Sequence, residues 1–223
     1  MKYEKERREI LSAALDMLQY SLISLSGGNI ALRTDEGSFL ITPSAMRYET
    51  MLPEDVVLLD AEGRVLEGCR RPSSDTKALL YLFRQRSEIN ALIHTHQPYA
   101  TAVGLVEDEL PGCLVTVLDA CGPCVPVAPF TISSDEGMGV LAAEYAGESL
   151  AVILRSHGVI TMGRNLSEAL EAAIYLEETA RTYLAARALG PVRLLSKEQI
   201  KAERSPRGNY GQLYENEKKE LLG

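Results

Sequence analysis

Apolar residues recur at helical spacing near the start of the chain, and shorter alternating runs follow. Residues 4–20 place Ile10, Ala14 and Leu18 on one side with charged residues between them, which predicts an amphipathic helix. Gly- and Asp-containing turns then separate short apolar runs, which is typical of hairpins. We expect two hairpins, formed by residues 30–33 with 39–42 and by residues 56–60 with 64–66.

The remaining chain mixes helical and strand-like patterns. We expect helices over residues 75–86, 98–104, 136–146 and 165–190. We expect strands or extended segments over residues 91–96, 114–119, 125–129 and 151–161, the last broken by Gly158. The tail from Lys197 is polar and poorly periodic. This order of elements predicts an α/β domain spanning residues 1–223, in which helices cover a sheet.

Length and charge restrict the kinds of molecule that this protein is expected to bind. A chain of 223 residues with 46% hydrophobic residues can bury a full core. Its formal net charge of -8 argues against nucleic acid as a partner, because phosphate neutralisation needs clustered Lys and Arg. A small anionic substrate stays possible, since backbone N–H groups and a metal can outweigh the net charge locally.

Two features of the sequence concern localisation. The first nine residues are highly charged and no apolar h-region follows them. No run approaches 18 uninterrupted apolar residues. We therefore expect a cytoplasmic protein with no membrane partner.

The four cysteines include Cys121 and Cys124, whose spacing is that of a redox motif. Such thiols are activated at a helix N-terminus, but Pro126 and Pro129 prevent a helix from starting here. The sequence favours a turn between strands with reduced thiols over redox chemistry.

All three histidines of the chain lie in apolar, strand-like runs. His94 and His96 are two positions apart, so they project from the same face of a strand, and His157 would arrive from a second strand. Three imidazoles with an open position are typical of a catalytic divalent metal. The alternative is three hydrogen-bonded core histidines without an ion.

Three polar turns could bind an anion. Ser73 and Ser74 stand at the predicted helix start, where N–H groups and hydroxyls favour phosphate. The alternative for these serines is plain helix capping. The Gly28-Asn29 turn and the turn bearing Ser44 and Ala45 offer further donors, although each could equally be an ordinary loop.

Two carboxylates and one tyrosine are further candidates for chemistry. Asp75 shortly precedes the first histidine-bearing strand and could ligate an ion or transfer a proton, or merely cap a helix. Asp119 ends an apolar run, where a charge needs a partner or a task. Tyr210, in the polar tail, would by default be a surface tyrosine.

Taken together and in this order, the Gly-Gly-Asn, Thr-Pro-Ser, Pro-Ser-Ser-Asp, His-Thr-His and Ser-His-Gly motifs resemble the class II aldolase and adducin family over about residues 5–212. The resemblance implies a three-layer α/β/α fold with a central mixed, mostly antiparallel sheet. It implies a divalent metal, with zinc first and Mn²⁺ or Co²⁺ as alternatives, on His94, His96 and His157. Phosphate of a small sugar phosphate would be held by these residues: Gly28, Asn29, Ser44, Ala45, Ser73 and Ser74.

The family's enzymes include L-fuculose-1-phosphate aldolase and L-ribulose-5-phosphate 4-epimerase, which share a retro-aldol step through an enediolate stabilised by the ion. The resemblance also implies a homotetramer with active sites between subunits. We favour the interpretation that the protein is an aldolase that releases dihydroxyacetone phosphate. The alternatives are the epimerase, a decarboxylase or dehydratase relative, and an adducin-like interaction module without a metal.

Some single residues of this chain match the aldolases, and others match the epimerases. Asp75 falls where the aldolases carry a catalytic Glu and the epimerases a metal-ligating Asp. Asp119 and Tyr210 match the epimerases' acid/base pair, contributed across a subunit interface. Against the epimerase, Thr42 replaces its lysine; against the fuculose aldolase, Val115 replaces a catalytic tyrosine. Ala45 replaces a glycine common to both.

Overall fold

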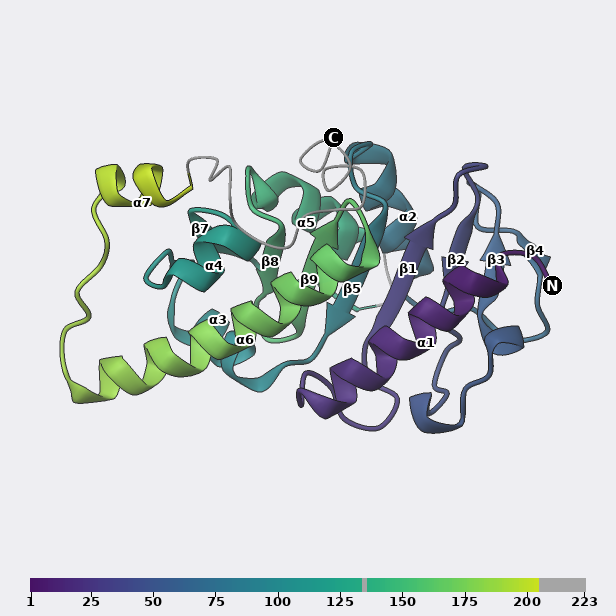
Figure 1. Cartoon of the computed structure of the whole chain (residues 1–223), viewed down its shortest axis with the longest axis horizontal. Coiled ribbons are helices and arrows are strands. Elements are labelled where there is room, and N and C mark those ends of the chain that lie inside the picture. The colour runs from purple at the N-terminus through teal and green to yellow at the C-terminus, as the bar shows by residue number, and fades with distance from the viewer. Residues whose placement is uncertain (134–135, 205–223) are drawn as a thin grey trace, which may run out of the picture.

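The computed structural model describes residues 1–133 and 136–204, and one nine-stranded sheet runs through them in the order β4-β3-β2-β1-β5-β9-β8-β7-β6 (Figure 1). The strands are β1 Asn29–Arg33, β2 Phe39–Ile41, β3 Val57–Leu59, β4 Val65–Glu67, β5 Ala91–Thr95, β6 Glu109–Pro111, β7 Cys124–Ala128, β8 Ala151–Leu154 and β9 Gly158–Gly163. The helices are α1 Glu4–Gln19, α2 Thr76–Gln85, α3 Pro98–Val106, α4 Val115–Ala120, α5 Gly137–Ala146, α6 Leu166–Leu189 and α7 Lys197–Glu203. Two 3₁₀ turns, Tyr48–Thr50 and Pro53–Asp55, precede β3.

The sheet is mixed and mostly antiparallel, as expected. Among the described strands, β7 and β8 form the parallel pair, and every other neighbouring pair is antiparallel. Strand β5 lies in the centre, between β1 and β9. The two hairpins predicted in the first half of the chain, β1–β2 and β3–β4, are confirmed.

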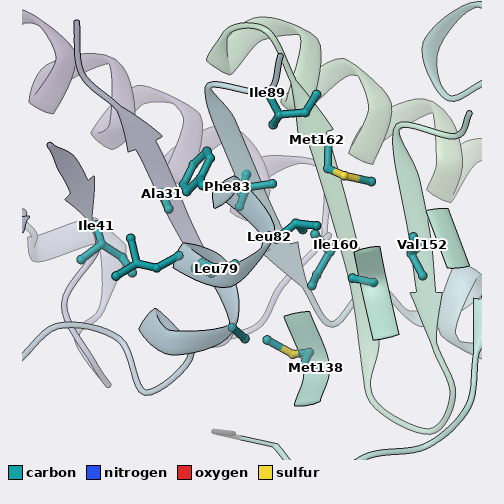
Figure 2. Packing of buried hydrophobic residues seen from close by; sticks show 14 of the residues in the cluster. Ala31, Ile41, Leu79, Leu82, Phe83, Ile89, Met138, Val152, Ile160 and Met162 are labelled. Carbon is teal, nitrogen blue, oxygen red and sulfur yellow. The ribbon is translucent and has the colours of Figure 1, made fainter. Parts of the chain in front are cut away.

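Helices α2 and α5 cover one face of the sheet. Alternate residues of the strands, such as Ala31, Ile41 and Ile160, point to this side and pack against Leu79 and Met138 (Figure 2). All five side chains are at most 2% exposed, so this layer is a dry core.

Helices α1, α3, α4 and α6 cover the other face. Because side chains alternate along a strand, Ile30 and Ile93 point to this side and pack with Ile10 of α1 and Ala173 of α6. The long helix α6 crosses the sheet in front of β5 and β9 (Figure 1). Helices therefore lie on both faces, which confirms the three-layer α/β/α prediction.

The strand predicted for residues 114–119 is wrong, because the chain forms helix α4 there. Val117 and Leu118 are buried whereas Val115 and Thr116 are exposed, and Cys121 donates from its thiol to the Ala172 carbonyl of α6. A short apolar run is compatible with either element, and here contact with α6 decides for the helix. Asp119 therefore lies exposed on a helix and does not end a strand.

Three smaller expectations also change. Residues 151–161 form no single strand: β8 and β9 are antiparallel, and the turn between them contains His157. Cys121 and Cys124 bound a turn between a helix and a strand, where burial raises the pKa of the Cys121 thiol to about 12. The tail begins with helix α7, capped by Ser196. No helix in the described part of the chain is long and apolar enough to cross a membrane.

Candidate functional site

The three histidines converge at one end of the central strands. His94 lies in β5, His96 directly follows that strand, and His157 lies in the β8–β9 turn. One ring nitrogen from each can be chosen so that all three atoms lie within 4.8 Å of one another. The Nε2 atoms of His94 and His96 are 3.1 Å apart. The predicted grouping is confirmed, although His157 comes from a turn and not from a strand.

The donor set fits a divalent metal ion. His94 Nδ1 lies 2.8 Å from the Val159 carbonyl oxygen, and since a carbonyl only accepts, Nδ1 carries the proton and Nε2 keeps its lone pair. Two nitrogens bound to one tetrahedral ion at ~2.1 Å stand about 3.4 Å apart. The observed separation of His94 and His96 is close to this value.

Burial keeps the imidazoles neutral. Desolvation lowers the pKa of His94 to about 4, and the negative charge of Asp75 opposes that shift. Burial also lowers the pKa of His96 and His157, which are each partly exposed. Neutral imidazole is the form that ligates a metal.

Glycines allow the backbone to approach these rings. Gly28 has a φ of 75°, and a Cβ there would lie 2.4 Å from the His94 carbonyl oxygen. At Gly158 a Cβ would lie 2.2 Å from the Thr95 carbonyl oxygen and 3.0 Å from the ring of His96. A side chain at either position would displace a ligand-bearing segment.

Asp75 and Asn29 form a buried pair beside the histidines. Asn29 is opposite His94 in the β1–β5 register, and its Nδ2 donates to Asp75 Oδ2 at 2.7 Å. Asn29 Oδ1 is buried and accepts no hydrogen bond within the described residues. A buried carbonyl oxygen without a donor is costly, so a ligand hydroxyl would be stabilised here. Asp75 begins α2, but its side chain makes no capping hydrogen bond to that helix.

The two serine-bearing turns lie side by side. The Ser44 N–H donates to the Arg71 carbonyl at 2.9 Å, and the Ser73 N–H donates to the Thr42 carbonyl at 3.1 Å. Ser73 Oγ accepts from the Asp75 N–H at 3.2 Å, just before α2, but the N-cap residue of that helix is Asp75, so the plain-capping alternative for Ser73 is not borne out. Ser74 is exposed, as are Ser44 and Ala45. The turns bearing Ser44 and Ser73 are thus joined to each other by backbone bonds, and Asp75 links Ser73 to Asn29.

One other candidate, Asp119, is not brought to the histidines in this chain. Asp119 is exposed on α4, beside Glu148 and Arg204 in a different pocket. Tyr210 lies outside the described residues.

Two supporting groups give no signal in the sequence. Tyr48 is buried, and its hydroxyl donates to the Gly28 carbonyl at 2.8 Å. The Thr42 hydroxyl accepts from the Ile30 N–H at 3.1 Å. Both bonds join segments distant in sequence, so only the folded sheet reveals them.

Comparisons with known proteins show what the whole chain is similar to. Residues 8–184 match the model of the class II aldolase and adducin N-terminal domain. The chain is 34% identical to a 5-deoxy-D-ribulose 1-phosphate aldolase from Bacillus thuringiensis serovar kurstaki, covering 95% of this chain and all of that one. It is 28% identical to an L-ribulose-5-phosphate 4-epimerase from Salmonella paratyphi B, with 94% and 99% covered. A solved L-fuculose 1-phosphate aldolase superposes with a TM-score of 0.84 at 28% identity, covering 88% of this chain and 93% of that one.

Proposed function

The chain belongs to the class II aldolase and adducin family, and from that premise we propose that it is a metal-dependent aldolase that cleaves a ketose phosphate. The observation that carries the proposal is the convergence of three histidine nitrogens beside the buried Asn29–Asp75 pair. The substrate to test first is 5-deoxy-D-ribulose 1-phosphate, the substrate named for the relative at 34% identity.

His94, His96 and His157 would hold the ion, with zinc as the first candidate and Mn²⁺ or Co²⁺ as alternatives. A divalent ion held by neutral imidazoles supplies a Lewis acid that stabilises negative charge on substrate oxygens. Asn29 orients Asp75, and its unpaired Oδ1 is available to a substrate hydroxyl. The hydroxyls of Ser44 and Ser74 are exposed for the substrate phosphate, with Ser73, Gly28 and Ala45 completing that site.

Cleavage needs two proton transfers. The hydroxyl of the departing aldehyde loses a proton, the C–C bond breaks, and its electron pair forms an enediolate whose carbon then takes up a proton. Asp75, in its protonated form, is our candidate donor to that carbon, because it is buried beside the histidines and fixed by Asn29. Asp119 and Tyr210, contributed by a neighbouring subunit of a homotetramer, are our candidates to accept the proton of that substrate hydroxyl.

The second candidate function is a sugar-phosphate 4-epimerase. It is favoured by the residue type at position 75, which is Asp and not Glu, and by similarity to a named epimerase. Asp75→Asn separates the two readings. An amide ligates more weakly than a carboxylate, so a metal ligand would lose metal occupancy, whereas a proton donor would keep the metal and lose turnover about a hundredfold or more.

The direct test is a panel of ketose 1- and 5-phosphates, with dihydroxyacetone phosphate release and inversion at C4 followed by NMR. We expect release without inversion. His94→Ala, His96→Ala and His157→Ala should each remove the metal and abolish turnover in a folded protein. Less than a tenth of an equivalent of metal in the wild-type chain after metal-replete expression would instead favour an adducin-like interaction module.

A further inference from the structure

Helix α3 begins immediately after one candidate ligand, and its N-terminus is tied to α6. Gln97 is the N-cap, and the residues that follow, Tyr99 and Ala100, donate their backbone N–H groups to the two oxygens of Glu177, each at 2.9 Å. Glu177 is only 8% exposed. A carboxylate at a helix N-terminus satisfies free N–H groups and complements the helix dipole.

The other end of α3 is tied to the turn that bears another ligand. The guanidinium of Arg155 donates to the Gly104 carbonyl at 2.7 Å and to the Glu107 carbonyl at 3.2 Å. It also pairs with Asp108 at 2.7 Å. Arg155 stands two residues before His157, and a cation at a helix C-terminus is again favourable.

The helix is also seated tightly on the sheet between these two ends. At Gly104 a Cβ would lie 2.6 Å from Cγ2 of Ile153, a residue of β8. Nine residues at ~1.5 Å rise make α3 about 13 Å long. With both ends and the middle fixed, the helix has little freedom to slide or tilt.

His96, two residues before α3, and His157, two residues after Arg155, lack the support that the sheet gives to His94. His94 lies within β5 and its ring is held by the Val159 carbonyl. His96 lies beyond the last residue of its strand, and His157 follows Ser156, whose φ is 60°, in the β8–β9 turn. The His157 N–H donates to the Leu154 carbonyl at 3.0 Å and closes the base of the turn. Both histidines nevertheless lie outside the paired residues of β5, β8 and β9, so the ladder bonds alone do not fix the separation of the two rings.

We propose that α3 holds His96 and His157 at the separation that metal binding requires, and that Glu177 and Arg155 are the positioning residues that fix its ends. This inference rests on the proposed metal-dependent function. Residues that do not touch the ion would thereby affect how tightly the protein binds it, as do groups that hydrogen-bond directly to metal ligands and orient them.

The test compares Arg155→Met and Glu177→Gln with a matched control, Arg33→Met. Arg33 is also a half-buried arginine, and it donates to the Phe83 carbonyl at 2.6 Å near the C-terminus of α2. It therefore has the same chemistry at the C-terminus of α2, a helix that no histidine adjoins in the sequence, whereas His96 lies two residues before α3. The measurements are Co²⁺ affinity by competition with a chelator, the visible spectrum of bound Co²⁺, and the urea midpoint.

We expect Arg155→Met and Glu177→Gln each to weaken Co²⁺ binding about tenfold and to change the spectrum. Arg33→Met should lower the urea midpoint and leave both cobalt readouts unchanged. Arg155→Lys keeps a cation at this position and should bind Co²⁺ more tightly than Arg155→Met. It therefore tests the proposal even if Arg155→Met does not fold.

Co²⁺ affinities and spectra equal to wild type in folded Arg155 and Glu177 variants would overturn the proposal while leaving the proposed function intact. A wild-type chain that binds no Co²⁺ would overturn both.

Discussion

Ala45 adopts a left-handed backbone conformation, with φ of 54°, at a position where the resemblance to the family leads us to expect glycine. Its side chain is exposed, so the methyl group contributes little stabilising packing. A residue with a Cβ in this conformation costs about 1–2 kcal/mol. Ala45→Gly should therefore raise the free energy of unfolding by about 0.5–1 kcal/mol, since glycine's greater unfolded-state entropy offsets part of the relief.

Urea titration of the two proteins checks this prediction. Ala61→Gly is the control, because Ala61 is an exposed turn residue without a positive φ and should gain nothing. Equal midpoints for Ala45→Gly and wild type would contradict this prediction, because the relief of strain at residue 45 would then be no larger than the entropic loss on introducing glycine.

The cysteines differ in their surroundings, and their reactivity should follow. Burial raises the pKa of Cys121 to about 12, whereas Cys69 is exposed. At pH 8 a thiol with that pKa is thiolate in about one molecule in ten thousand. We expect a thiol reagent to modify Cys69 within minutes in native protein and to reach Cys121 only after denaturant is added.

Mass spectrometry of the labelled peptides gives the order of modification. Burial, with help from the nearby Glu109 charge, also raises the pKa of Cys124, to about 11. Rapid labelling of Cys121 and Cys124 together would contradict the assignment of this turn as structural.

At the scale of elements, the sequence identifies α1 and α2 by their apolar stripes and the first two hairpins by their turn residues. It identifies α6 by the Asn165 cap before it and by Gly190 after it, because that helix has no marked apolar stripe. Prediction from sequence fails where local pattern and long-range contact disagree. Val115-Thr-Val117 has strand propensity, but contact with α6 makes it helical. The β8–β9 turn is missed for another reason: Arg155-Ser-His157 contains none of the usual turn residues except Ser.

The start of α6 carries a testable cap. Asn165 accepts the Glu168 N–H at 2.9 Å, as expected of a cap, but the Glu168 carboxylate returns to the N–H of Arg164 and not to that of Asn165. Replacing an N-cap Asn by Ala costs ~1 kcal/mol. We expect Asn165→Ala to lower the free energy of unfolding by that amount, measured by urea titration.

Ser196 offers the comparison, because it caps the exposed helix α7. Since no residue of α7 is buried, Ser196→Ala should fray that helix and leave the global midpoint almost unchanged. A larger loss for Ser196→Ala than for Asn165→Ala would reverse this ranking.

At the scale of the whole molecule, the surface after β7 is unusually apolar. Phe130 is 64% exposed and Ile132 is 73% exposed. Exposed apolar surface of this kind often marks an interface. With the tetramer expected from the family resemblance, we predict that the wild-type protein sediments as a tetramer at micromolar concentration, and that Phe130→Ser with Ile132→Ser yields smaller, folded species.

Sedimentation velocity with circular dichroism tests both halves of this statement. A wild-type monomer would remove the basis for a site shared between subunits. A double variant that stays tetrameric would place the interface elsewhere.

The sequence predicts some residues of the candidate site but not the main-chain contacts that support them. The three histidines share an identifiable spacing, and the structure brings them together. The carbonyl of Val159 that orients His94, and the Tyr48 hydroxyl that holds Gly28, depend on main-chain positions brought close by folding. No local pattern in the sequence encodes such contacts.

The central place of β5 has a kinetic consequence. The partners His94 and Val159 are 65 positions apart, and β5 joins the N-terminal half of the sheet to the C-terminal half. The three-histidine site is therefore complete only after the two halves have docked, late on the way to the native state. A bound ion should then slow unfolding severalfold and leave the refolding rate nearly unchanged. The ion would stabilise the completed sheet and take no part in the folding nucleus.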